Sequence, residues 1–348
     1  MDIYSFSKKT GKQAVAFLGL FVLPFLAYPA LAQTYQIQDF SDDYYAIIKS
    51  TNDADSETNS IVEIRDAKTK KILISQPADI DIDYELDNSE AHQLGNKISA
   101  NIVSLPYGES SVLIYDDFNF DNKFDLAIKD GRNGCYGGPS YQVYLKQGKT
   151  FVHSDSFTDL AQGNCGFFDI DEDTQTLHTM TKSGAAWHQY SEYKVINNKP
   201  VAVRIVEEEY NSKGLLSILE KTRVNGKMVE NQYQRLAMYE EGDESSRYVY
   251  EFDLDNGKKM ILDSYDEDHL YYAFADKDGK IELYYDGQFI YDAKQNTLSF
   301  TNKPGVYQIN NKGITVKTSN KSVLLKAKID SVGGNLDNLG RFENVDVK

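Results

Sequence analysis

The stretch VLIYDDFNFDNKFDLAI, residues 112–128, places an acidic loop between two apolar segments. The apolar flanks are rich in aliphatic and aromatic residues, which is typical of β-strands. Between them, oxygen-bearing side chains occupy every second position of the acidic loop, Asp116 to Asp125. This pattern is compatible with a solvated acidic turn, a calcium loop, or part of an active site. In each case the flanks predict a strand–loop–strand unit.

Calcium is the interpretation that the spacing favours. Counted from the first ligand, oxygen side chains fall at positions 1, 3, 5 and 9, and position 7 holds Lys123, where such loops use the backbone carbonyl. An EF-hand is excluded because position 12, which needs a bidentate Glu, holds Ile128. The predicted Ca²⁺ ligands are Asp117, Asn119, Asp121, Lys123 and Asp125.

The remaining residues of the acidic loop also have predicted places. Asn122 can adopt a left-handed conformation, which the turn requires. We expect the three phenylalanines to point away from the ion into the core; they are Phe118, Phe120 and Phe124. A catalytic role for the loop stays open as an alternative, but it needs a second carboxylate at working distance.

The rest of the chain predicts a mainly β protein. Short runs alternate apolar and polar residues, as in Tyr44–Ile48, Tyr141–Leu145 and Tyr248–Phe252. Dipeptides suited to tight hairpins separate such runs; they are Asn225-Gly226, Asn256-Gly257, Asp278-Gly279 and Asp286-Gly287. Only Leu215–Lys221 and Gln232–Tyr239 read as short helices.

The N-terminus has the pattern of a secretory signal peptide, residues 1–32. A basic segment precedes an apolar run at residues 14–27, and Ala30-Leu31-Ala32 follows as a cleavage site. A membrane anchor is the alternative, but the apolar run is short for a membrane span of about 20 residues. The sequence therefore predicts export to the periplasm, with no membrane anchor in the mature form.

The mature chain divides into two predicted domains at an acidic segment, residues 239–246. Residues 33–242 form an N-terminal antiparallel β domain that contains the acidic loop and a glycine-rich loop. Residues 243–348 form a C-terminal β domain. Its closely spaced strands between residues 270 and 318 predict a β-sandwich or a barrel.

The net charge limits the classes of partner that the protein can bind, and the cysteine content predicts a disulfide. The formal net charge of −16 disfavours nucleic acid and anionic membranes, and it favours a basic protein or cations. Solubility alone would explain it equally well. The chain has two cysteines, Cys135 and Cys165, and in an oxidising compartment such a pair predicts a disulfide.

No motif for transition-metal, nucleotide or serine-hydrolase chemistry occurs. The five histidines form no pair at the spacing of a metal motif, and the sequence has no glycine-rich phosphate loop. We therefore predict that the protein is not an enzyme. Trp187 is the single tryptophan, and it is expected either to pack in the core or to stack on sugars.

A glycine-rich loop, Asp130 to Tyr141, follows the acidic loop. Its glycines and proline shape a turn-rich segment, and an exposed Tyr on such a loop would suit an anchor in another protein's cleft. The predicted partner-binding residues are Tyr136, Gly137, Gly138, Pro139, Ser140 and Tyr141. The alternative is a structural loop whose two tyrosines pack inward.

The run DDFNFDNKFDLAI followed by NGCYGGPSYQVYL resembles a family of exported bacterial proteins related to periplasmic lysozyme inhibitors. FFDID at residues 167–171 and TKSGAAW at 181–187 fit the same pattern, and the resemblance covers roughly residues 100–195. Members serve as immunity proteins against peptidoglycan-cleaving effectors of antibacterial type IV secretion systems.

The resemblance implies a function. In that family the acidic loop binds calcium and a protruding loop plugs the cleft of the hydrolase, which here would be a lysozyme-like peptidoglycan hydrolase. The residues after about 245 lie outside the resemblance. Two other functions remain open from the residues: a calcium-dependent carbohydrate- or cell-surface-binding module, and a hydrolase that uses the acidic loop.

Overall fold

The chain folds into a series of β-sheets, which confirms the mainly β prediction. The structure is a computed structural model that describes residues 34–50, 58–82, 97–99, 101–105, 107, 111–211, 214–236, 248–264, 268–303 and 305–348. The predicted signal peptide and the predicted boundary segment, residues 239–246, lie outside these residues. In the described part of the chain, no helix is long and apolar enough to cross a membrane.

The first sheet has six strands in the order β4-β3-β2-β1-β6-β5. All its pairs are antiparallel except β1 with β6, which run parallel. Ala46 and Ile48 share one face of β2 and are fully buried, and Ile47 on the other face is buried as well. The strands are β1 (Thr34–Ile37), β2 (Tyr44–Ser50), β3 (Ser60–Asp66), β4 (Ile72–Ala78), β5 (Lys97–Ser99) and β6 (Ile102–Leu105).

The second sheet is antiparallel, in the order β10-β9-β8-β7. One face packs on the first sheet through Leu113, Leu126 and Ile128. The other face, with Ala127 and Val143, packs on a short helix and the start of the next sheet. The elements are β7 (Leu113–Asp116), β8 (Asp125–Gly131), β9 (Ser140–Gln147), β10 (Thr150–His153) and helix α2 (Asp155–Leu160).

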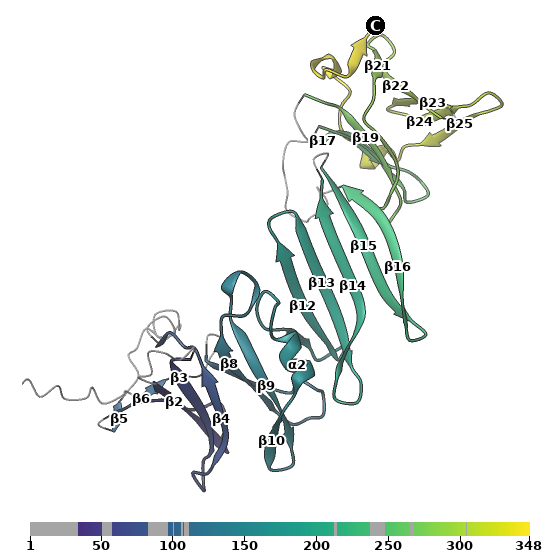
Figure 1. Cartoon of the computed structure of the whole chain (residues 1–348). Coiled ribbons are helices and arrows are strands. Elements are labelled where there is room, and N and C mark those ends of the chain that lie inside the picture. The colour runs from purple at the N-terminus through teal and green to yellow at the C-terminus, as the bar shows by residue number, and fades with distance from the viewer. Residues whose placement is uncertain are drawn as a thin grey trace, which may run out of the picture.

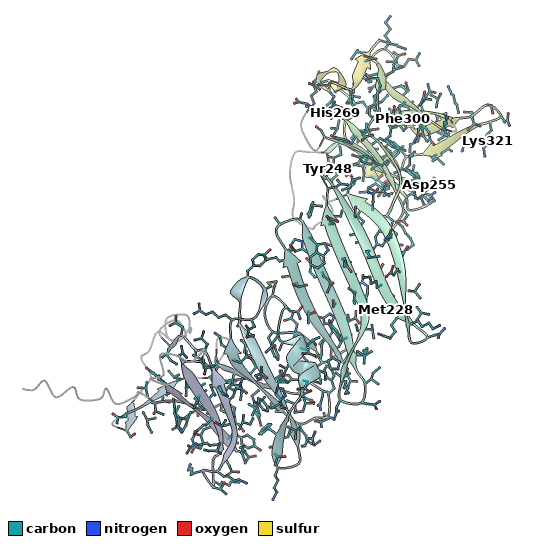
Figure 2. The ribbon with its side chains drawn as sticks, in the orientation of Figure 1. Met228, Tyr248, Asp255, His269, Phe300 and Lys321 are labelled. Atoms are coloured by element: carbon teal, nitrogen blue, oxygen red, sulfur yellow. A yellow bond between two sulfur atoms is a disulfide. The ribbon has the colours of Figure 1, made fainter. Side chains whose placement is uncertain are left out.

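A third sheet, called here the long sheet, has the antiparallel order β11-β12-β13-β14-β15-β16. In Figure 1 it stands between the N-terminal and C-terminal sheets, and Met228 lies near the end of its last hairpin (Figure 2). Its strands are β11 (Asp169–Asp171), β12 (Thr176–Ser183), β13 (Trp187–Val195), β14 (Pro200–Tyr210), β15 (Leu215–Val224) and β16 (Lys227–Leu236).

The two predicted helices are wrong. Leu215–Lys221 lies in β15, and the described part of Gln232–Tyr239 lies in β16. The two strands pair along their whole length around the Asn225-Gly226 turn, in which both residues have positive φ, 51° and 81°. That turn geometry matches the twist of paired strands, so hairpin pairing overrides a weak local helical pattern.

Two further sheets share one core at the C-terminal end. Phe300, labelled in Figure 2, is buried in that core, and neither sheet closes on itself among the described residues. One sheet is β20-β19-β18-β17-β26, with β17 (Tyr248–Asp253), β18 (Lys259–Asp263), β19 (Tyr271–Ala275), β20 (Ile281–Tyr285) and β26 (Gly333–Gly334). The other is β25-β24-β23-β22-β21-β27, with β21 (Phe289–Asp292), β22 (Thr297–Asn302), β23 (Gly305–Asn310), β24 (Gly313–Lys317), β25 (Ser322–Lys326) and β27 (Val345–Val347).

Of the three hairpin dipeptides predicted in this region, two lie between paired strands and one does not. Asn256-Gly257 joins the paired strands β17 and β18, and Asp278-Gly279 joins the paired strands β19 and β20. Asp286-Gly287 is not a hairpin, because β20 and β21 belong to different sheets. The dipeptide instead carries the chain from one sheet to the other.

Candidate functional site

The acidic loop closes the β7–β8 hairpin, whose last pair is Asp116 with Asp125. Asp117 lies at its centre: one carboxylate oxygen accepts the amide of Asp121 at 3.0 Å and the other accepts the amide of Asn122 at 2.6 Å. Phe120 and Asn122 have positive φ, 60° and 62°. The left-handed turn predicted at Asn122 is therefore present, and the loop is folded around its first Asp.

The other loop oxygens take part in the same network. Asn119 Oδ1 accepts the amide of Asp121 at 3.2 Å, and Asp121 accepts the amide of Lys123 at 3.0 Å. The Lys123 ammonium lies 2.9 Å from the second oxygen of Asp121, and this hydrogen bond raises the pKa of Lys123. Short-range hydrogen bonds of this kind fix the backbone conformation of the acidic loop.

Asp125 ties the acidic loop to the core. Its side chain is fully buried, and its two oxygens accept the amides of Phe118 at 3.1 Å and Lys146 at 2.7 Å. Burial raises the pKa of Asp125 to about 7, although both hydrogen bonds oppose that shift. Among the described residues Asp125 has no ion-pair partner, so its charge is not compensated by a side chain.

The donor chemistry of the acidic loop fits a hard cation, but a complete metal site is not preformed. Among the residues that the structure describes, no group of three or more His, Cys, Asp or Glu side chains is gathered around one point. Each carboxylate oxygen has two lone pairs, so an oxygen that accepts an amide can still bind a cation. Carboxylate and amide oxygens are the ligands that Ca²⁺ prefers.

The three loop phenylalanines do not share one environment. Phe118 is fully buried, and Phe120 packs partly against the same core. Phe124 is 51% exposed, so its predicted place in the core is wrong. It precedes the first residue of β8 and lies edge-on to Tyr115, with 5.1 Å between ring centroids. Leu126 takes the inward position instead.

The glycine-rich loop is fixed from several directions. Cys135 forms the predicted disulfide with Cys165, and its amide donates to the Asn164 carbonyl at 2.8 Å. The Gly134 amide donates to the Gly138 carbonyl at 3.0 Å. A Cβ at Gly134 would lie 2.6 Å from the Pro139 carbonyl oxygen, so glycine is required where the two sides of the loop approach.

Tyr136 projects from this fixed loop. It lies in a short 3-10 turn, η1 (Cys135–Gly137), with φ 53°, and the residue is 69% exposed. Its hydroxyl accepts the Gly184 amide, and the Lys182 ammonium lies 5.7 Å from its ring centroid. Lys182 lies near the end of β12, and Gly184 lies in the turn that follows it. The ring is therefore oriented by two elements while most of its surface remains open.

The C-terminal part of the predicted partner-binding segment lies inside the protein. Ser140 is fully buried; its hydroxyl donates to Asp130 at 2.6 Å and accepts the Asn133 amide at 3.1 Å. Tyr141 is 9% exposed and packs on Phe167 at 5.2 Å. Of the two open interpretations, Tyr141 follows the inward-packing one, because strand alternation in β9 turns it toward α2, and its predicted place among the partner-binding residues does not fit. Gly137 is exposed, and Gly138 and Pro139 are half-buried.

Trp187 does not lie in any core cluster of the described residues. It begins β13, is half-buried, and lines a surface pocket of about 510 Å³ on the long sheet. The prediction that Trp187 packs in the core is therefore wrong. The pocket could not be read from the sequence, because its residues come from four strands whose register only the fold sets.

Comparison with known proteins leaves the family open. No known protein family model matches the chain, and no curated protein matches it. Among solved structures, a Xanthomonas type IV secretion system related protein is 21% identical, with 56% of this chain and 92% of that chain covered and a TM-score of 0.41. A proposed 6-phosphogluconolactonase from Bacteroides uniformis is 10% identical, with 86% and 87% covered and a TM-score of 0.22. These scores are too low to assign a fold family or an activity.

Proposed function

We propose that this chain is an exported inhibitor of a lysozyme-like peptidoglycan hydrolase, and that it acts by inserting the Tyr136 loop into the cleft of that enzyme. The observation that carries the proposal is one exposed aromatic side chain on a loop that is otherwise fixed. Tyr136 is 69% exposed, although its loop is held by a disulfide and backbone hydrogen bonds.

A fixed loop favours tight binding because little conformational freedom is lost on association. Tyr gives a large contact area with few rotatable bonds, which is why it is common at the centre of interfaces. The contacts of Tyr136 with Gly184 and Lys182 orient the ring before any partner arrives. Gly137 leaves the tip of the loop narrow, as entry into a cleft requires.

The proposed partner is a basic protein. The chain carries a net charge of −16, and a hydrolase that works on anionic cell walls is commonly basic. Opposite charges raise the association rate by steering the two proteins together. The inhibitor itself has no catalytic role in this proposal, and it is not an enzyme.

Calcium has a structural role in the proposal. The side chains of Asp117, Asn119, Asp121 and Asp125 and the carbonyl of Lys123 would hold one Ca²⁺. Support comes from the left-handed turn at Asn122 and from the buried charge of Asp125, which an ion would compensate. The loop would then brace β8, the strand that leads directly into the glycine-rich loop.

Localisation to the periplasm completes the proposal. The disulfide between Cys135 and Cys165 suits an oxidising compartment, where the wall hydrolases act. The leader at residues 1–32 would direct the chain there.

A cell-wall turbidity assay tests the function. Purified residues 33–348 are added, in calcium, to a panel of lysozyme-fold hydrolases. We expect near-stoichiometric inhibition of at least one enzyme, and at least about a hundredfold loss of potency in Tyr136→Ala, as for a central interface anchor. Tyr190→Ala is the matched control, because Tyr190 is a second exposed tyrosine, 45% exposed, on the long sheet. The absence of inhibition across the panel would refute the proposal.

A further inference from the structure

The pairing of four strands in the long sheet brings polar side chains and Trp187 onto one face. Trp187 lies opposite Glu209, Glu209 opposite Ser217, and Ser217 opposite Gln234. The adjacent row on the same face contains Glu207, Leu219 and Gln232. Because side chains two residues apart in a strand share a face, these rows form one continuous surface.

These same residues line the pocket of about 510 Å³, a volume within the usual range for small-ligand sites. Ile218 and Tyr233 also line it, although they pack together on the opposite face. Because strand alternation points these two side chains away from the pocket, Ile218 and Tyr233 line the floor of the pocket with their backbone. The pocket is wide across several strands, which suits an extended ligand more than a compact one.

The lining contains the groups that recognise sugars. The indole of Trp187 offers a flat apolar surface for the C–H face of a pyranose ring. Around it, carboxylates accept hydrogen bonds, the Gln232 and Gln234 amides donate and accept them, and the Ser217 hydroxyl does both. Alternating donors and acceptors match the hydroxyl groups of a saccharide.

Charge narrows the class of saccharide. Glu207 and Glu209 exclude an anionic ligand by repulsion. Glu207 is already paired with Lys221 at 2.8 Å, so the pocket does not present two unpaired carboxylates to a cation. We propose that this face of the long sheet binds a neutral oligosaccharide chain, with Trp187 as the stacking platform. This site is separate from the acidic loop, and its binding does not depend on inhibition of a hydrolase.

Trp187 itself reports on the test, since it is the only tryptophan of the chain. Purified residues 33–348 are titrated with three probes: an N-acetylglucosamine tetramer, cellotetraose and maltotetraose. We expect a saturable shift of the tryptophan emission with at least one probe. The double variant Gln232→Ala, Gln234→Ala should weaken that binding about tenfold, because two hydrogen bonds to the sugar are lost. Both residues are exposed, so the variant should fold normally, and Trp187 is still present to report binding.

Two controls make the result specific. Tyr190→Ala removes an exposed aromatic ring from the opposite face of the same strand and should leave the affinity unchanged. Tyr136→Ala should also bind the sugar normally, whereas it should lose inhibition in the turbidity assay. Conversely, Trp187→Ala should lose sugar binding by calorimetry and keep inhibition, so the two functions can fail independently.

Three outcomes would overturn the inference. The first is no saturable emission change and no binding heat with any of the three tetrasaccharides. The second is sugar binding that the Gln232 and Gln234 variant leaves unchanged. The third is saturable binding of an oligolysine peptide, lost in Glu209→Gln, with no binding of sugars, which would make the pocket a cation site.

Discussion

Asp125 is the residue on which the order of the acidic loop depends most directly. It is fully buried and accepts the amides of Phe118 and Lys146. We expect Asp125→Ala to lower the free energy of unfolding by about 3 kcal/mol, because one buried and one half-buried amide lose their acceptor, at roughly 1–3 kcal/mol each. Urea unfolding in EDTA measures this, since the chelator removes any calcium contribution.

Glu172→Ala is the comparison for that measurement, because Glu172 is an exposed acidic residue outside the loop. It should change the free energy of unfolding by less than about 0.5 kcal/mol. Equal losses in the two variants would mean that Asp125 is no more important than a surface carboxylate.

Glu63 predicts a dependence of stability on pH. Burial raises its pKa, but hydrogen bonds and charges from Lys49 and Arg65, both 2.5 Å away, outweigh that and hold the pKa below 4.5. A lowered folded-state pKa contributes stability above the unfolded-state pKa, and that stability is lost as the pH falls through the folded-state value. We expect the free energy of unfolding to fall below about pH 4.5.

Glu63→Gln isolates this contribution. The variant should be less stable than the parent at neutral pH, and the difference between the two should shrink as the pH falls toward 3, measured by urea unfolding at each pH. A difference that stays constant from neutral pH to about pH 3 would show that ionisation of Glu63 adds nothing to stability.

At the scale of elements, the sequence predicted strands well and side-chain direction less well. Runs such as Tyr44–Ile48 and Tyr248–Phe252 are rich in aromatic and β-branched residues and form β2 and β17. Leu215–Lys221 reads locally as a helix, but its pairing partner lies beyond a turn and decides its state. Tyr136 and Tyr141 look equivalent in sequence, and only the start of β9 at Ser140 separates the exposed ring from the buried one.

The acidic loop is the element that predicts a calcium effect. If the loop binds Ca²⁺, saturation at a hundred times the dissociation constant stabilises the folded state by about 2.7 kcal/mol. For a chain of 348 residues, with an unfolding entropy of about 2.1 cal/mol/K per residue, that corresponds to a rise of roughly 4 °C in melting temperature. Differential scanning calorimetry in calcium and in EDTA measures the difference.

Asp117→Ala separates calcium from other effects of the chelator. Asp117 is the first predicted ligand, and in its absence the melting temperature should be the same in calcium and in EDTA. A parent protein whose melting temperature does not change with EDTA would rule out a structural calcium ion. If the melting temperature of Asp117→Ala responds to calcium and EDTA as that of the parent does, the ion binds at another site.

For the whole molecule, the arrangement of sheets explains what the sequence could and could not predict. Local patterns indicate strands, hairpins and the disulfide, because each depends on nearby residues or on a pair of cysteines. The Trp187 pocket depends on the relative register of four strands, β13 to β16. Register is set by pairing along the whole sheet, so no local pattern contains it.

The net charge of −16 is the property of the whole molecule that bears on how fast it would find a basic partner. Electrostatic steering acts over roughly 10 Å at 0.1 M salt and only about 3 Å at 1 M. We therefore expect the association rate with an inhibited hydrolase to fall at least about tenfold between 50 mM and 500 mM salt. The dissociation rate should change much less, because the Tyr136 contacts are short-range.

Surface plasmon resonance at several salt concentrations measures both rates. Tyr136→Ala provides the opposite pattern, since loss of a central contact should raise the dissociation rate and leave the salt dependence of association intact. An association rate that is independent of salt would mean that the acidic surface serves solubility and does not guide binding. Such a result would contradict the proposal that the partner is basic, but it would not contradict the proposed role of Tyr136 as the anchor.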